Sequence, residues 1–291
     1  MRYSPAQHVR PFARTACIAL ALSALLAGCA PAEEPSPAPA PTPNAQQPAE
    51  EPQARPVEFP AAVFLLANST VAPVRRSLDI AAPAAGEPRS DDPAVLQALL
   101  ETLVEGPSAE ELAAGYASAL GPDIEVSAVR IEGGVATAGF SAGFASGGAA
   151  AVAQRCAQVV FTLTGAGVER VAFEVDGVAF DAPGGTREDF AALRPGILVT
   201  SPLPGDTISS PVPLRGESNT SAASFVIQVV DASGQTVTEQ LFSGGGSGQW
   251  LGFETAVEFE ASPGDGQLLM YDPAAPGGMA GPAARVPVTF E

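Results

Sequence analysis

Residues 124–140, IEVSAVRIEGGVATAGF, decide the fold of the first half of this chain. One extended run ends near Ile131 and a second begins at Val135, with Glu132-Gly133-Gly134 between them. Runs of this length and composition form strands, and a glycine pair permits the positive backbone angles of a tight turn. The stretch therefore predicts an antiparallel β-hairpin.

A helix and further strands are predicted directly after this hairpin. Residues 149–164 carry apolar side chains at helical spacing, namely Val152, Cys156, Val159, Val160 and Leu163. Residues 168–175 predict the next strand, which Asp176-Gly177 turns into 178–180. Strands joined by a helix predict an α/β domain. Cys156 is expected to be a small buried residue, because only Arg155 stands near enough to lower the pKa of its thiol.

Two more strands and two helices are predicted upstream. Residues 62–67 form a continuous apolar run, typical of a buried strand, and residues 71–80 indicate a second extended segment. Asp92 and Pro93 predict a helix start, and Gly106-Pro107 ends that helix. Ser108 and Glu111 have the spacing of a capping box, for a shorter helix to about residue 120.

Beyond Pro195-Gly196 the pattern changes to a period of two. Alternating strands are predicted around 225–229, 253–259 and 286–290, with glycine-rich turns between strands. Six or seven strands in residues 197–291 predict an all-β sandwich of the immunoglobulin-like class. Residues 181–196 are expected to be a connector between two independently folding domains, open to limited proteolysis.

The N-terminus carries an export signal. Three arginines precede an uncharged run that ends in Leu26-Ala27-Gly28-Cys29, which resembles the lipobox of bacterial lipoproteins. Residues 1–28 are then a signal peptide, and Cys29 is the lipid attachment site. An ordinary secretory signal with a chance cysteine is the alternative. Residues 29–58 hold nine prolines and no aromatic side chain, which predicts a disordered, extended tether.

Composition excludes several classes of function. All 14 basic residues are arginine and the only histidine is His8, so the chain after the signal lacks the residues of Ser-His-Asp, Cys-His, Schiff-base and P-loop chemistry. Residues 29–291 carry 11 arginines against 32 acidic residues, a formal charge of −21, which argues against nucleic acid as a partner. Membrane attachment is expected through the lipid alone. No catalytic, cofactor-binding or metal-binding residue is predicted.

Five segments resemble the GerMN domain of bacterial sporulation and germination proteins. They are Val74-Arg75-Arg76, 103–107, 129–137, 158–164 and 168–177, in the family's order. The resemblance covers residues 59–180 and implies an α/β envelope module with no established enzymatic activity. One departure is Gly139, where the family often has an acidic residue, so no role of that acid carries over.

The second region resembles the immunoglobulin-like domain of bacterial spore germination proteins. Residues 201–211, 214–219 and 285–289 carry the likeness, and this domain often follows GerMN.

Three residues are candidate partner contacts. Trp250, beside a glycine-rich loop, is the best candidate, with Tyr271 as a possible second ring of a glycan platform; core packing is its alternative. Arg75 and Arg76 are candidate binding residues for an anionic partner. The alternative is that they belong to the solvated face of a strand.

These observations predict a lipid-anchored, non-enzymatic cell-envelope protein. It would sit on the outer face of the cell membrane, or on the outer membrane, and bind an envelope protein or wall polymer in assembly, signalling or sporulation. The alternatives are a carboxylate-dependent hydrolase of wall glycan or peptide, and a spacer without a ligand.

Overall fold

The computed structural model describes residues 56–81, 86–246, 248–275 and 283–291. The expected signal peptide, the lipid attachment residue Cys29 and the tether up to residue 55 lie outside the described residues. Strand β1 (Pro56–Ala67) begins at Pro56, before the expected start of order at Phe59, because Pro56 already lies opposite Ala81 of β2 (Thr70–Ala81).

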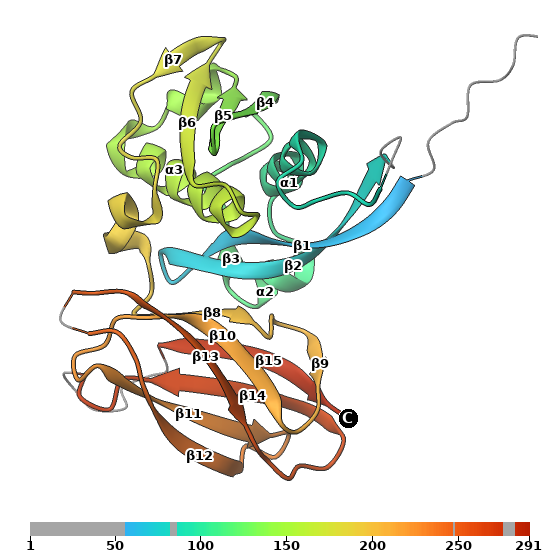
Figure 1. The fold of residues 1–291 in the computed structure, drawn as a ribbon, viewed down its shortest axis with the longest axis vertical. Coiled ribbons are helices and arrows are strands. Elements are labelled where there is room, and N and C mark those ends of the chain that lie inside the picture. The colour runs from blue at the N-terminus through green and yellow to red at the C-terminus, as the bar shows by residue number, and fades with distance from the viewer. Residues whose placement is uncertain (1–55, 82–85, 247, 276–282) are drawn as a thin grey trace, which may run out of the picture. The chain divides into compact units, whose positions relative to one another are not determined.

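The first sheet is built on the β1–β2 hairpin, with strand order β2-β1-β3 (Figure 1). Asn68 and Ser69 form its turn with positive φ angles of 49° and 66°. Strand β3 (Tyr116–Ala117) covers only the end of the other edge of β1, opposite Leu66 and Ala67. The expected strands at 62–67 and 71–80 are therefore confirmed as one longer hairpin.

Helix α3 (Gly148–Gly165) hydrogen-bonds to the part of the β1 edge that β3 leaves unpaired. The backbone N–H of Phe64 donates to Thr162 Oγ1 at 3.0 Å, and Gln158 Nε2 donates to the Phe64 carbonyl at 3.0 Å. Both α3 side chains are fully buried. Because the polar backbone groups of Phe64 point away from β2, Pro73 stands opposite Phe64 without breaking a ladder hydrogen bond.

The second sheet contains the hairpin predicted from residues 124–140. Its order is β4-β5-β6-β7, with β5 and β6 parallel and the other pairs antiparallel. Helix α3 connects β5 to β6, as a parallel pair requires. The strands are β4 (Val126–Glu132), β5 (Val135–Phe140), β6 (Arg170–Val175) and β7 (Val178–Phe180).

The two early helices follow their capping signals. Helix α1 (Pro93–Glu105) starts on Asp92, whose carboxylate accepts from the Arg89 N–H and makes no cap bond, and it ends at Gly106. The capping box of Ser108 and Glu111 is confirmed, but α2 (Ala109–Ala113) stops well short of residue 120. Gly115, at φ +89°, turns the chain so that β3 can pair with β1.

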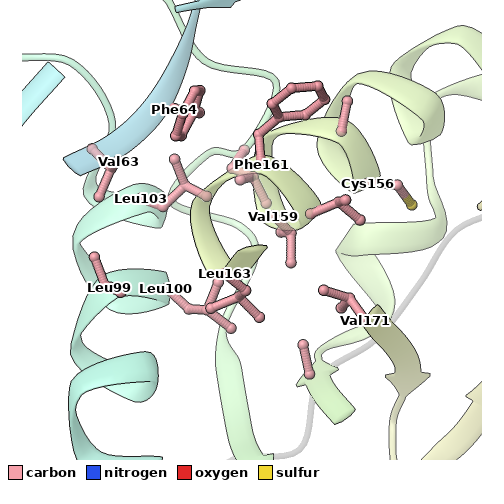
Figure 2. Packing of buried hydrophobic residues seen from close by; sticks show 14 of the residues in the cluster. Val63, Phe64, Leu99, Leu100, Leu103, Cys156, Val159, Phe161, Leu163 and Val171 are labelled. Carbon is pink, nitrogen blue, oxygen red and sulfur yellow. The ribbon is translucent and has the colours of Figure 1, made fainter. Parts of the chain in front are cut away.

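The core of this domain lies where α1 and α3 pack against the two sheets. Figure 2 shows Phe64 and Phe161 side by side above Leu103, and their ring centroids are 5.6 Å apart. Cys156 is fully buried in the same core, as expected.

The second domain is a sandwich of two sheets in the described residues. Their orders are β13-β10-β8 and β12-β11-β14-β15-β9, and apolar residues of both sheets form one core. Eight strands are present where six or seven were expected, since the short β9 pairs in parallel with the end of β15. They are β8 (Ile197–Ser201), β9 (Asp206–Ile208), β10 (Val212–Ser218), β11 (Ser224–Asp231), β12 (Thr236–Ser243), β13 (Leu251–Val257), β14 (Gly264–Tyr271) and β15 (Ala284–Phe290).

The connector is packed onto the first domain. Its 3-10 helix η2 (Arg187–Leu193) is capped where the Asp189 carboxylate accepts from the N–H groups of Gly185 and Thr186. Phe190 is 3% exposed and belongs to the first core. Gly185 is required here because a Cβ would lie 2.4 Å from the Val171 carbonyl oxygen. The predicted order of an α/β domain followed by a β-sandwich is confirmed.

Candidate functional site

The two arginines predicted as contacts are each bound to a carboxylate of this chain. Arg75 makes two hydrogen bonds to Asp206 at 2.8 and 2.7 Å, and its side chain is half exposed. Arg76 binds Glu111 at 2.5 and 2.7 Å, and both side chains are largely buried. The hydrogen bonds from Arg76 hold the pKa of Glu111 below its usual value. Both guanidinium groups are therefore engaged within the chain, although Arg75 still presents half of its side chain to solvent.

Trp250 lies directly before β13 and is partly exposed. The guanidinium carbon of Arg194 lies 3.7 Å from the centre of its ring, a cation–π contact. Tyr271 is 9% exposed, and burial raises the pKa of its phenol. Trp250 thus presents one side to Arg194, and Tyr271 is too covered to serve as an open platform.

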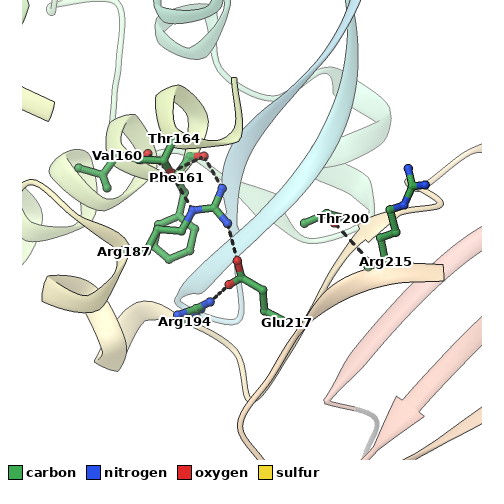
Figure 3. Close-up of polar contacts among 8 residues, drawn as sticks. All are labelled: Val160, Phe161, Thr164, Arg187, Arg194, Thr200, Arg215 and Glu217. Atoms are coloured by element: carbon green, nitrogen blue, oxygen red, sulfur yellow. Dashed lines mark hydrogen bonds and ion pairs between the residues drawn. The ribbon is translucent and has the colours of Figure 1, made fainter. Parts of the chain in front are cut away.

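Arg194 also belongs to a cluster of charged side chains between the connector and β10. Arg187, Arg194 and Glu217 meet here, and we call these three residues the arginine–glutamate junction (Figure 3). Arg187 Nη1 donates to Glu217 Oε1 at 3.0 Å, and Arg194 forms an ion pair with the other carboxylate oxygen. One carboxylate of β10 thus serves two guanidinium groups of the connector.

Arg187 is also held by the first domain. Its Nε donates to Thr164 Oγ1 at 2.7 Å and its Nη2 to the Phe161 carbonyl at 3.3 Å. Its guanidinium carbon lies 5.0 Å from the Phe161 ring centre and 5.6 Å from that of Phe64. The end of α3, the connector and β10 are therefore joined through one side chain.

The junction is largely shielded from solvent on its arginine side and carries one excess positive charge. The side chains of Arg187 and Arg194 are 16% and 3% exposed. Burial lowers the pKa of Arg187, and burial together with the positive charge of Arg187 lowers the pKa of Arg194 to about 10. The Nε and Nη1 atoms of Arg194 have no hydrogen-bond partner among the described residues.

A polar groove of about 570 Å³ adjoins the junction. Arg187, Glu217, Arg215 and Glu254 line it together with glycines of β10 and β13. Arg215 binds Glu254 at 2.8 Å, with both side chains more than 60% exposed. Each of the two carboxylates that line the groove is thus paired with a guanidinium group.

Other reactive groups are sparse in the described part of the chain. Burial raises the pKa of the Cys156 thiol to about 12, which keeps it protonated. No group of three or more His, Cys, Asp or Glu residues is placed to hold a metal ion there. A second cavity of about 560 Å³ is lined mainly by apolar residues of β2, β8 and β15 and by Tyr116.

Sequence reasoning missed all three residues of the junction. Arg187 lies in the 3-10 helix that the capping box of Thr186 and Asp189 begins. No local pattern indicated that Glu217, thirty residues away, would be its partner.

The fold and this site define a two-domain protein: an α/β domain and a β-sandwich joined through a packed connector. Residues 62–181 match the Germane family, described as sporulation and spore germination, and residues 196–279 match Gmad2, an immunoglobulin-like domain of bacterial spore germination. The first domain is therefore of the Germane (GerMN) type and the second of the Gmad2 type, as the sequence motifs predicted. Germination domains of these types have no known catalytic activity.

Three of the similar solved structures are from Bacillus subtilis and Clostridium perfringens. The tandem GerMN domains of the sporulation protein GerM from Bacillus subtilis are 17% identical over 69% of this chain and 62% of that chain, with a TM-score of 0.35. The first GerMN domain alone is 26% identical, over 44% of this chain and 92% of that one, with a TM-score of 0.32. A candidate lipoprotein from Clostridium perfringens is 14% identical over 48% of this chain and 83% of that chain, with a TM-score of 0.29.

This chain spans 62% of the tandem GerM structure. A search of the curated proteins returned no significant match. The domain assignment rests on the family matches, since all three structural likenesses are low.

Proposed function

We propose that this protein is a lipid-anchored, non-enzymatic component of the bacterial cell envelope that acts by binding a partner in a sporulation or germination-type process. The observation that carries the proposal is the tandem of a Germane and a Gmad2 domain in one chain.

The anchor is supported by the sequence at its N-terminus. Leu26-Ala27-Gly28-Cys29 follows a basic segment and an uncharged run, as in lipoprotein signals. No helix in the described part of the chain is long and apolar enough to cross a membrane. Lipid on Cys29 would place both domains on the outer face of the cell membrane, or on the outer membrane of a cell that has one.

The described residues favour binding over catalysis. The residues after the signal contain no histidine or lysine, and the carboxylates of the polar groove are paired with arginines. The partner is an envelope protein or wall polymer that tolerates an acidic surface. Trp250 and its neighbour Leu251, 54% exposed, are our first candidate for the contact, with the half-exposed Arg75 as the second.

Affinity capture from detergent-solubilised membranes, with wall material present, tests the proposal. Wild-type protein should retain one envelope protein or wall fraction, and Leu251→Asp should retain less while its circular dichroism stays unchanged. Thr236→Asp, at an exposed site on β12, is the control. Release of cleaved glycan or peptide from the wall material would instead support the hydrolase.

A further inference from the structure

The arginine–glutamate junction joins the two domains through a single carboxylate. Glu217 extends from β10 of the second domain, whereas Arg187 and Arg194 belong to the connector. Arg187 is in turn bonded to Thr164 and Phe161 of α3. Every polar link within the junction from the first domain to β10 therefore runs through Glu217.

Charge makes this carboxylate hard to replace. The buried guanidinium of Arg194 and the largely buried one of Arg187 share Glu217, so neutralising Glu217 would leave both positive charges without their carboxylate. The Arg194 guanidinium already lacks partners for two of its nitrogens in the described residues. Loss of the carboxylate should therefore drive at least one arginine into water.

The other ion pair between the domains in the described residues has the more exposed arginine. Arg75 of β2 reaches Asp206 of β9, but its side chain is half exposed. Water screens the charge of the half-exposed Arg75 more than it screens the charges of Arg187 and Arg194. Arg215 and Glu254, both more than 60% exposed on the second domain, provide a matched pair that joins nothing to the first domain.

We propose that Glu217 is the positioning residue that locks the second domain to the connector, so that both domains move as one body and present one composite surface. Neutralising Glu217 releases the lock, with Arg187 leaving α3 and Arg194 leaving Trp250. This inference goes beyond the proposed function, because it holds whatever partner is bound.

Two native probes report on the lock. Trp250 is the only tryptophan of the chain, so its emission and quenching follow the Arg194 contact directly. Trypsin cleaves only after arginine in this lysine-free chain, and the bond after Arg187 lies in the packed connector. Cleavage after Arg89, whose side chain is 74% exposed, is the internal reference.

Glu217→Gln in the full-length protein in detergent is the test. We expect cleavage after Arg187, relative to Arg89, to rise more than about tenfold, since a broken buried ion pair costs more than the free energy of one factor of ten. Acrylamide quenching of Trp250 should increase together with it. Glu254→Gln should change neither measurement, although it removes an ion pair of the same chemistry.

Wild-type cleavage and quenching in Glu217→Gln would overturn the proposal, as would equal changes in Glu254→Gln. Should Glu217→Gln lose its strand signal in far-ultraviolet circular dichroism, Glu217→Asp replaces it. The shorter side chain draws the carboxylate back from both guanidinium groups, so increases in the same direction are expected in a folded protein. Wild-type behaviour of folded Glu217→Asp would then overturn the proposal.

Discussion

At the scale of single residues, Cys156 illustrates how burial overrides a neighbouring charge. Cys156 lies on α3, and its thiol is fully buried in the core. Burial raises the pKa of the thiol to about 12, although Arg155 directly precedes it in the chain. Arg155 turns its guanidinium to the carbonyl oxygens of Ala119, Phe144 and Ser146 instead. Its charge therefore serves the loops and leaves the thiol unactivated.

Cys156 should resist thiol reagents in the folded protein. A pKa of about 12 leaves on the order of one thiol in ten thousand ionised at pH 8, and the native core also excludes the reagent. Labelling with a chromogenic disulfide should be undetectable in native buffer and complete in urea, with Cys156→Ala as the background. Rapid labelling of native protein would contradict the buried assignment.

Trp250→Ala should destabilise the protein modestly. The partly exposed ring contributes a cation–π contact to Arg194, so we expect a loss of about 1–2 kcal/mol in the free energy of unfolding. Phe225→Ala, at a fully buried ring 4.8 Å from that of Phe253, should cost about 3–5 kcal/mol. Urea unfolding measures both. A loss as large as that of Phe225→Ala would place Trp250 among the core aromatics.

At the scale of elements, one carboxylate starts α2 and ties it to the first sheet. Glu111 closes the capping box on the Ser108 N–H at 2.8 Å and also binds Arg76 of β2. The hydrogen bonds from Arg76 are the main reason that the pKa of Glu111 is lowered, and the Ser108 N–H adds to them. A helix too short to be stable alone is thereby held in place.

Glu111→Gln should remove a pH-dependent part of the stability. Because the folded pKa is lowered, the contribution is fully present above the unfolded value of about 4.3 and is lost as the pH falls through the folded pKa. The difference in unfolding free energy between wild type and Glu111→Gln should be largest near neutral pH and shrink in acid. Equal differences at pH 7 and pH 3 would argue against this role.

At the scale of the whole molecule, the net negative charge influences the rate at which a partner associates. The chain after the signal has 11 arginines and 32 acidic residues. Several of those arginines form ion pairs with carboxylates of the same chain. The remaining surface is acidic. Association with a basic partner should therefore slow as salt is added, whereas an apolar contact should be insensitive to salt.

Cys29→Ala should move the protein from the membrane fraction to the soluble fraction. The prediction rests on the residues before Cys29, which supply the basic and uncharged segments of a lipoprotein signal. Fractionation followed by immunoblotting measures it, and Cys156→Ala, which should stay in membranes, is the control. Membrane retention of Cys29→Ala at the wild-type level would place the anchor elsewhere.

The sequence by itself determined the elements and their order. Periodicity, caps and turn residues act within a few positions, so the hairpin at 124–140, helix α3, the capping box of Ser108 and the buried state of Cys156 were all predictable. The change to apolar residues at every second position beyond residue 196 likewise predicted the β-sandwich.

Only the tertiary structure decided how the arginines are used and where α2 ends. Helix α2 ends at Ala113 because the residues that follow it, Tyr116 and Ala117, pair with the edge of β1. That edge comes from a distant part of the chain, about fifty residues earlier. Arg75 meets Asp206 across 131 positions, and Arg187 meets Glu217 across 30. The sequence around a long polar side chain has no periodic pattern that predicts its partner. These contacts therefore form only when the strands and the connector fold together.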